Sequence, residues 1–249
     1  MDDYKYAVEI FNFHLKEYKK NHHLKGKTIL ELGPGDSIVT ALISSAYGAK
    51  CILSDVGSFA TKDIEIYKDI ANNLRESIPN MPDISSADSL DDVLNLTNSE
   101  YLIDGLKDLK SIESNTVDII FSEAVLEHVR KDNFLETLKE LNRILKRDGF
   151  SSHNVDLKDH LDYSLNNLRF SEKIWESDFM MNSGFYTNRL QYKDIIELFQ
   201  EANFKIETIS IEKWDKLPVD KKHFASPYNE LEDELLNISG FHMFAKISK

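Results

Sequence analysis

Two segments of this 249-residue chain hold glycines and carboxylates at a spacing suited to ligand binding. In Glu31-Leu32-Gly33-Pro34-Gly35, which ends a short apolar run, the glycines let the backbone approach a ligand closely because they lack a Cβ. Asp55 follows Gly35 by 20 residues, where a carboxylate can bind ribose hydroxyls. Ile38 stands where the dinucleotide fingerprint has its third glycine. The pattern predicts an adenosine-like ligand without pyrophosphate, and Glu31 suits an ammonium group.

A second set of residues could transfer protons. His153, Asp156 and His160 lie at or just after an apolar run at 150–157, and Glu127-His128 follow another at 116–122. Histidine suits a general base because its pKa lies near neutrality. We expect His153 to be the first candidate base, whereas a packed helix residue is the favoured interpretation of His128. Two His and two Asp within residues 153–160 could also bind a divalent metal, but no metal motif has this spacing, so we predict none.

Alternating strands and helices are predicted to position these groups. Helical spacing of Tyr6, Ile10, Phe13 and Tyr18 predicts a helix at 4–20, and further helices are expected at 36–47 (capped by Asp36 or Ser37) and 132–146 (ended by Gly149). Apolar runs predict strands at 28–32, 51–56, 101–103, 116–122 and 150–157. This alternation indicates a parallel sheet whose strand ends meet at one edge.

Three segments extend beyond that pattern. Residues 57–100 are expected to form an insertion with one or two helices, and 158–190 an acceptor-pocket insert. Residues 191–249 predict a helix at 192–202, with Asn203 as a left-handed cap, and strands at 205–214 and 240–248. We interpret 1–249 as one domain. The predicted acceptor contacts are His128, Asn167, Arg169, Tyr186, Asn188 and Arg189, since arginine forks suit carboxylate or phosphate. The alternative is a packing insert whose arginines pair with acids.

The charge balance restricts the partners. With 30 basic and 43 acidic side chains, the net charge of −13 disfavours nucleic acid and anionic membrane surfaces. No apolar run approaches the roughly 18 residues that span a bilayer, and the N-terminus lacks a signal-peptide centre. The single cysteine, Cys51, excludes an intramolecular disulfide. We therefore expect a cytoplasmic protein acting on a small molecule; the sequence does not indicate its oligomeric state.

The motifs in their order resemble those of class I S-adenosylmethionine (SAM)-dependent methyltransferases. The matching residues are ELGPG at 31–35, Asp55, VDIIFSEAVLEHV at 117–129 and LKELNRILKRDG at 138–149. The resemblance covers 28–157 well, as a SAM-binding core, and 158–249 more loosely. It implies a Rossmann-like α/β fold with a mostly parallel seven-stranded sheet, helices on both faces and a helical insert or lid. The long 57–100 segment and Arg147-Asp148-Gly149, where the family usually has Pro-Gly-Gly, depart from the pattern.

The resemblance also implies SAM as the cofactor and assigns its contacts. The glycine turn, with Glu31, Gly33, Pro34 and Gly35, would pack against the amino acid part of SAM. Asp55, with Val56 beside it, would bind the ribose, and Asp104, Gly105 and Leu106 would contact adenine. Ser122 and Glu123 match the loop after the fourth strand of the core.

We expect O-methylation of a small polar or anionic metabolite, because a neutral hydroxyl needs the base that the histidines could supply. The pattern at 153–189 resembles methyltransferases found beside bacterial surface-polysaccharide synthesis. It suggests a sugar, nucleotide sugar or other capsule precursor, including phosphoramidate-type groups. N-methylation of a small amine is a close variant. The alternatives are a non-catalytic methyltransferase-like partner protein and, less favoured, a nicotinamide-dependent oxidoreductase.

Overall fold

The computed structural model describes residues 4–248 and contains a seven-stranded sheet of order β3-β2-β1-β4-β5-β7-β6. The strands are β1 (Thr28–Leu32), β2 (Lys50–Ser54), β3 (Ser99–Leu102), β4 (Val117–Glu123), β5 (Leu145–Asp156), β6 (Phe204–Lys213) and β7 (Ile238–Ile247). β1 pairs in parallel with β2 and β4, β2 pairs in parallel with β3, and only the β6–β7 pair among these described registers is antiparallel. The predicted Rossmann-like, mostly parallel sheet is confirmed.

Contacts within the described part of the chain form two compact units. The first holds the described residues up to Glu123 together with Glu140–Ser152, and the second holds Ala124–Lys139 and the described residues from His153 onward. β5 and α6 (Phe134–Ile144) therefore each contribute residues to both units. The prediction of a single domain stays a prediction.

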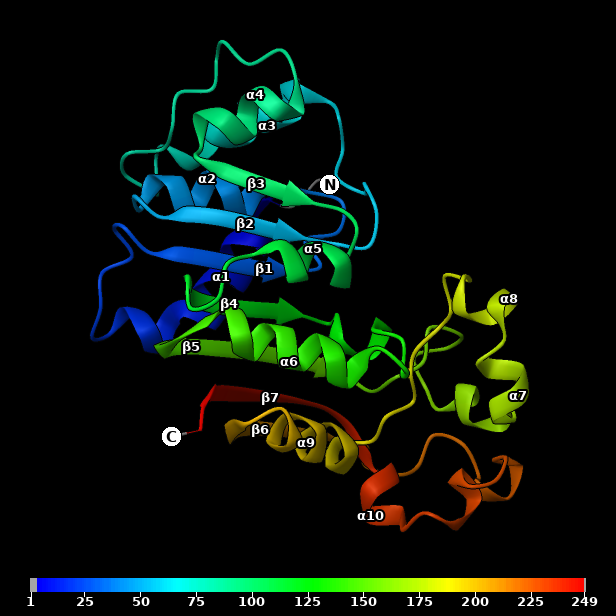
Figure 1. Cartoon of the computed structure of the whole chain (residues 1–249). Helices are drawn as coiled ribbons and strands as arrows, with labels where there is room; N and C mark the ends of the chain where they lie inside the picture. Colours follow the sequence, from blue (N-terminus) through cyan, green and yellow to red (C-terminus); the bar gives the residue numbers. More distant parts are fainter. Residues whose placement is uncertain (1–3, 249) are drawn as a thin grey trace. The chain divides into compact units, whose positions relative to one another are not determined.

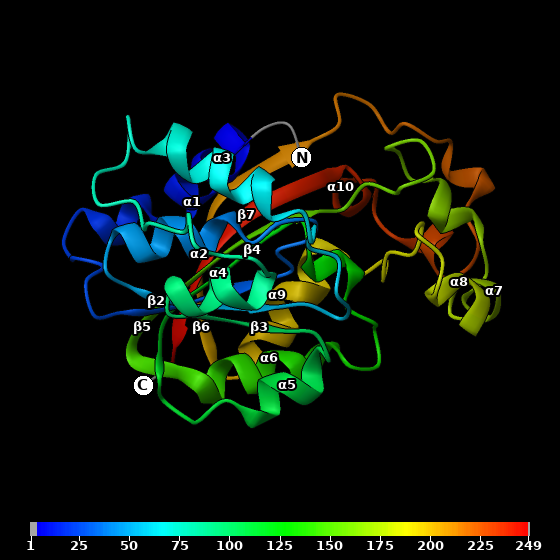
Figure 2. The ribbon, with the colours of Figure 1, turned by 90° about the horizontal axis from the view of Figure 1, so that it is seen from above.

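The first unit is built around β3, β2, β1 and β4, which lie side by side in that order in Figure 1. Its helices are α1 (Tyr4–Lys19), α2 (Val39–Ala46), α3 (Ile64–Leu74), α4 (Leu90–Leu96) and α5 (Leu106–Ser111). Figure 2 shows α1 and α2 on one face of the strands and α5 on the other. β4 is buried along six of its seven residues, as expected for a parallel strand covered on both faces.

α1 packs through a face that combines aromatic residues with a histidine. The helix buries Phe11, His14, Leu15 and Tyr18, whereas Tyr6 is 56% and Phe13 is 43% exposed. Phe11 stacks on Tyr47 and meets Phe121 edge-on, so these aromatic contacts set the rotation of the helix. The predicted helix is present, and a histidine takes part in its packed face.

Two predicted helix ends are also corrected. α2 begins after Ile38 without a side-chain cap; Ser37 only accepts a hydrogen bond from the Val39 N–H, 3.4 Å away. Gly149 lies inside β5 rather than after a helix. A Cβ on Gly149 would come within 2.6 Å of Leu145 Cδ1 and 2.7 Å of the Lys146 carbonyl oxygen, so close packing against its own chain explains this glycine.

The second unit pairs β6 and β7 with α9 (Tyr192–Glu201), which buries Ile195 and Phe199. Asn203, after α9, has a φ of +63° and confirms the predicted left-handed position. Residues 158–190 contain the short helices α7 (Glu172–Trp175) and α8 (Asp178–Met181), and α10 (Asp233–Leu236) precedes β7. A small separate core joins 165–168 to 224–236, formed by Leu165, Leu168, Phe224, Tyr228 and Leu236.

Candidate methyl-donor and proton-transfer sites

The glycine turn follows β1 as predicted. Gly33 and Gly35 have φ values of +70° and +66°, a region that favours glycine. The Gly33 N–H donates to the Ser54 carbonyl oxygen over 2.8 Å and joins the turn to the end of β2. A Cβ built on Gly35 would meet no atom within 4 Å, so the space beside this residue is open.

Asp55 is fixed beside that turn. Its Oδ2 accepts from the Gly35 N–H at 3.2 Å and its Oδ1 from the Val56 N–H at 2.7 Å. Burial raises the pKa of Asp55, although these two hydrogen bonds act in the opposite direction. Val56 itself is 78% exposed, so an apolar side chain stands open beside the carboxylate. This arrangement can hold a hydroxyl-bearing sugar.

The predicted adenine segment adjoins Asp55. The Gly105 N–H donates to the Asp55 carbonyl oxygen over 2.9 Å, and Gly105, at φ +55°, would clash with Val56 Cγ1 if it carried a Cβ. Asp104 pairs with Lys107, and Leu106 begins α5. The structure thus brings 104–106 together with Asp55 and Val56.

Glu31, in β1, is a partly buried carboxyl that precedes the same turn. Burial raises its pKa to about 7; a hydrogen bond with Thr40 lowers this value, and the charge of Asp55 raises it. Such a carboxyl is readily protonated when alone and loses its proton to solvent when a cation binds beside it. Glu31 therefore fits an ammonium-bearing ligand.

The strand order places a switch point between β1 and β4. From β1 the chain proceeds to β2 on one side, and β4 lies on the other. In such sheets ligands bind beyond the carboxyl ends of the strands at this point. Ser122 pairs with Leu32, so Glu123 and Gly33 each follow directly from paired residues. Ser122 is completely buried, and Glu123 Oε2 lies 3.0 Å from His14 Nε2.

Sequence reasoning missed His14. The spacing of apolar residues predicted the N-terminal helix, but no motif marks a single histidine there. Only its burial among aromatic residues, together with partners 109 and 138 residues away in sequence, shows its connection to the end of β4.

In the second unit, three predicted proton-transfer residues lie close together. His128 ends the short 3-10 helix η1 (Leu126–His128), and its ring meets the His160 ring edge-on at a centroid distance of 4.7 Å. His128 Nδ1 lies 2.9 Å from the Tyr186 carbonyl oxygen. A carbonyl only accepts, so Nδ1 carries the proton in the neutral ring and Nε2 keeps its lone pair.

The surroundings keep His128 neutral. Burial lowers its pKa; the Tyr186 carbonyl raises it, His160 lowers it further and Asp156 raises it. His128 and His160 remain exposed to solvent. A neutral, accessible imidazole with a fixed tautomer has the chemistry of a general base. A chemical role for His128 stays a prediction.

His153 does not join this pair. Its side chain is completely buried in β5 and packs against the Phe199 ring at 5.3 Å. Asp156 Oδ1 accepts from the Lys158 N–H and is paired with Lys158 Nζ at 3.2 Å. His160 and Asp156 lie near enough to His128 to change its pKa. His153, by contrast, is a buried residue of the core.

The predicted acceptor contacts in 165–190 make mostly internal bonds. Asn188 Nδ2 donates to the Leu126 and Val129 carbonyl oxygens at 2.8 and 2.9 Å, so it fixes the segment that carries His128. Asn167 Nδ2 donates to Thr187 Oγ1, and the Tyr186 hydroxyl donates to Glu176. Arg169 is exposed and bonds only weakly to Asn166, at 3.4 Å.

Arg189 follows the packing alternative. Its guanidinium donates to the Phe170 carbonyl oxygen at 2.7 Å and pairs with Glu172 at 3.0 Å and Glu176 at 3.4 Å. The group also lies over the Trp175 and Tyr228 rings. Its side chain is completely buried and its terminal nitrogens have partners, and it lines a cavity with Asn167 and Asn188; its contact with an acceptor stays a prediction.

Comparison with known proteins identifies the class that this fold and turn define. A methyltransferase-domain family model matches residues 6–209, and the chain belongs to that family. It is a SAM-dependent methyltransferase. A comparison with curated proteins found no match.

Solved structures share the fold at low identity. A SAM-dependent methyltransferase from Methanosarcina mazei is 15% identical, with a TM-score of 0.55 over 93% of this chain and 98% of that one. Phosphoethanolamine N-methyltransferase 2 of Haemonchus contortus, solved with SAM, is 15% identical, with a TM-score of 0.51; the match covers 95% of this chain and 52% of that one. An arsenic(III) methyltransferase of Chlamydomonas reinhardtii is 14% identical, with a TM-score of 0.50; the match covers 91% of this chain and 65% of that one.

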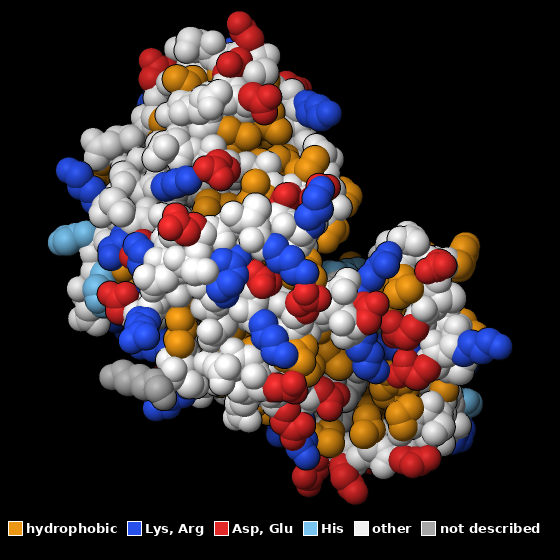
Figure 3. Space-filling view, in the orientation of Figure 1, with side chains coloured by type: hydrophobic (Ala, Val, Ile, Leu, Met, Phe, Trp, Pro, Cys, Tyr) orange, Lys and Arg blue, Asp and Glu red, His pale blue; other side chains and the backbone are white. Residues whose placement is uncertain are grey.

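Three further observations concern the surface, membrane-spanning helices and metal ligands of the described chain. Acidic and basic side chains are interspersed on the face shown in Figure 3, without a continuous basic surface. Across residues 4–248, no helix is long and apolar enough to cross a membrane. Over the same range, no group of three or more His, Cys, Asp or Glu side chains could hold a metal ion.

Proposed function

We propose that this methyltransferase acts on a small polar acceptor through a protic group, most simply a hydroxyl. The observation that carries the proposal is the hydrogen bond from His128 Nδ1 to the Tyr186 carbonyl oxygen, because it leaves Nε2 able to take a proton. A hydroxyl is a poor nucleophile until it loses its proton, so such a base is what O-methylation needs.

The roles of the chain's own residues follow from the two sites. Glu31, the turn at Gly33–Gly35 and Asp55 would hold SAM, which supplies an activated methyl group. His128 would accept the acceptor's proton, and the Asp156 carboxylate would stabilise the imidazolium that forms. His153 is not assigned this role because it is buried against Phe199.

We further propose a sugar, nucleotide sugar or related surface-polysaccharide precursor as the acceptor. The support is the resemblance of 153–189 noted above, together with a net charge that disfavours nucleic acid. Asn167, Asn188 and Arg189 make internal bonds and also line one cavity with Glu127 and Asp156, which supports a place for them on the acceptor side of the site. Arg169 remains available to an anionic group.

A screen for S-adenosylhomocysteine release tests this proposal. Nucleotide-activated sugars and capsule precursors, including phosphoramidate-bearing ones, would be incubated with enzyme and SAM, with primary amines and catechols as comparison acceptors. We expect turnover with a hydroxyl-bearing sugar and its loss in His128→Asn. Turnover with amines alone, unaffected by His128→Asn, would contradict the hydroxyl proposal.

A further inference from the structure

A buried histidine links the N-terminal helix to the end of β4. His14 is completely buried; its Nδ1 lies 2.7 Å from Ser152 Oγ and its Nε2 lies 3.0 Å from Glu123 Oε2. The His14 ring also stacks on Phe121, with centroids 5.1 Å apart and planes at 26°. Both nitrogens and one ring face are thus engaged, which fixes the orientation of the imidazole.

Burying the His14 imidazole carries a desolvation cost that an apolar residue at this position would avoid. Burying a polar ring requires hydrogen bonds to offset its desolvation, whereas an apolar residue would pack without them. The neighbouring buried positions of α1, Phe11 and Leu15, are apolar. His14 instead directs one nitrogen at a carboxylate, and that carboxylate belongs to the last residue of β4.

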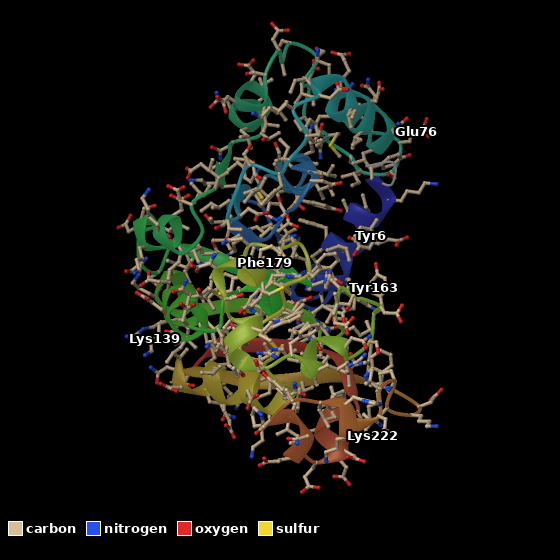
Figure 4. The ribbon with its side chains drawn as sticks, turned by 90° about the vertical axis from the view of Figure 1, so that its right-hand side faces the viewer. Tyr6, Glu76, Lys139, Tyr163, Phe179 and Lys222 are labelled. Carbon is tan, nitrogen blue, oxygen red and sulfur yellow. The ribbon has the colours of Figure 1, made fainter. Side chains whose placement is uncertain are left out.

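Glu123 lies at the end of β4, next to the glycine turn that follows β1. Glu123 follows Ser122, whose strand partner Leu32 is followed by Gly33, so the carboxylate belongs to the β1–β4 switch point beside the glycine turn. Its side chain is 19% exposed. Tyr6 lies in the first turn of α1 (Figure 4). Burial raises the pKa of its hydroxyl, and the charge of Glu123 raises it further, so the Glu123 carboxylate acts on this end of the helix as well.

We propose that His14 is a positioning residue that holds the Glu123 carboxylate toward the bound methyl donor, so that α1 forms part of the donor site. SAM carries a sulfonium charge that S-adenosylhomocysteine (SAH) lacks. A fixed carboxylate therefore favours the donor over the spent product on charge alone. This role does not depend on which acceptor is used.

Binding measurements with both ligands separate this role from simple packing. Calorimetry would give the dissociation constants of SAM and SAH for the wild type, Glu123→Gln, His14→Phe and the control Glu9→Gln, which removes an exposed carboxylate from the same helix. We expect Glu123→Gln to weaken SAM about tenfold relative to SAH, the effect of one nearby charge. His14→Phe, which keeps a ring on Phe121, should shift the ratio in the same direction, and Glu9→Gln should not.

Partial rescue gives a further criterion. His14→Gln can restore one hydrogen bond to Glu123, so its SAM-to-SAH ratio should lie between those of the wild type and His14→Phe. If His14→Phe does not fold by circular dichroism, Ser152→Ala, which removes the Nδ1 partner, takes its place under the same criteria.

The outcomes that overturn the proposal are specific. An unchanged ratio in Glu123→Gln would show that its carboxylate does not face the donor. Equal weakening of SAM and SAH in His14→Phe would reduce His14 to a packing residue. Because no acceptor is present in these titrations, neither result depends on the proposed substrate.

Discussion

Gly35 donates its backbone N–H to the side chain of Asp55, with a nitrogen–oxygen distance of 3.2 Å. The bond joins the turn after β1 to the first residue after β2, and it orients the carboxylate without using all of its acceptor sites. Two residues that were predicted separately, one for backbone approach and one for hydroxyl binding, are therefore joined by a hydrogen bond, as expected if both belong to the proposed donor site.

Asp55→Ala should weaken SAM binding while the chain remains folded. Hydrogen bonds to a charged group contribute about 1.5–3 kcal/mol each, so losing the ribose contact should raise the dissociation constant at least about tenfold. Calorimetry measures this change, and circular dichroism checks the fold. A dissociation constant equal to that of the wild type would remove Asp55 from the site.

Glu31 should make SAM binding depend on pH. With a folded-state pKa of about 7, Glu31 is mostly protonated at pH 6 and must release a proton to meet an ammonium. SAM affinity should therefore fall as the pH is lowered from 7.5 to 6, with proton release visible in buffers of different ionisation enthalpy. Glu31→Gln should remove this component; an identical pH dependence in the variant would assign it elsewhere.

The raised pKa of Glu31 should also make the stability of the fold depend on pH. The raised pKa of Glu31 gives a contribution that is fully present below the unfolded value, about 4.3, and is lost as the pH rises through about 7. Ligand-free Glu31→Gln should thus lose less stability than the wild type between pH 5 and pH 8. Denaturant unfolding at the two pH values measures the difference.

His128→Asn should lower kcat far more than it changes SAM affinity. General base catalysis contributes about 10²–10⁴-fold, so a loss within that range is expected with a hydroxyl acceptor. His153→Asn is the matched comparison, and it should act mainly on stability because that ring is buried. The acid limb of the wild-type kcat/KM profile should lie below the ordinary histidine pKa, in line with the lowered pKa of His128. Greater loss of kcat in a folded His153→Asn would reverse the assignment.

Asp118 should stabilise the first unit in a pH-dependent way. Its carboxylate pairs with Lys27 at 3.0 Å and with Lys146 at 2.7 Å, and it accepts from the Thr28 N–H. Burial raises the pKa of Asp118, but these partners outweigh it and hold the pKa below the usual range. The contribution is therefore present above about pH 4 and is lost as the pH falls through the folded-state value.

Asp118→Asn should cost about 2 kcal/mol at neutral pH, a reduced value because both lysines are about one-third exposed. Urea unfolding at pH 7 and pH 3 measures the loss, which should shrink at the lower pH. An equal loss of unfolding free energy at pH 7 and pH 3 would mean that the charge of Asp118 does not contribute to stability.

Much of this architecture could be predicted from the sequence because its signals are local. Short apolar runs bounded by a glycine turn or an acid gave β1, β2 and β4, and the register places Asp55 where the spacing indicated. Helix ends were less predictable. Gly149 resembles a cap, yet it serves close packing against Leu145.

The proton-transfer residues could be predicted as types but not as an arrangement. The roles of His128 and His153 depend on which ring meets Tyr186 and which meets Phe199, contacts that spacing does not encode. The residue type of Arg189 suits an anionic ligand, but spacing does not reveal that Glu172 and Glu176 pair with its guanidinium.

Asp159 limits how the loop beside His160 can change. Its buried carboxylate accepts the backbone N–H groups of Leu161, Asp162, Ser164, Asn166 and Asn167. Since each amide must reach one of two oxygens, the number of residues wound around the carboxylate is fixed. Adding or deleting a single residue here would strand buried amides, so this loop can diversify by exchanging side chains but not by changing its length.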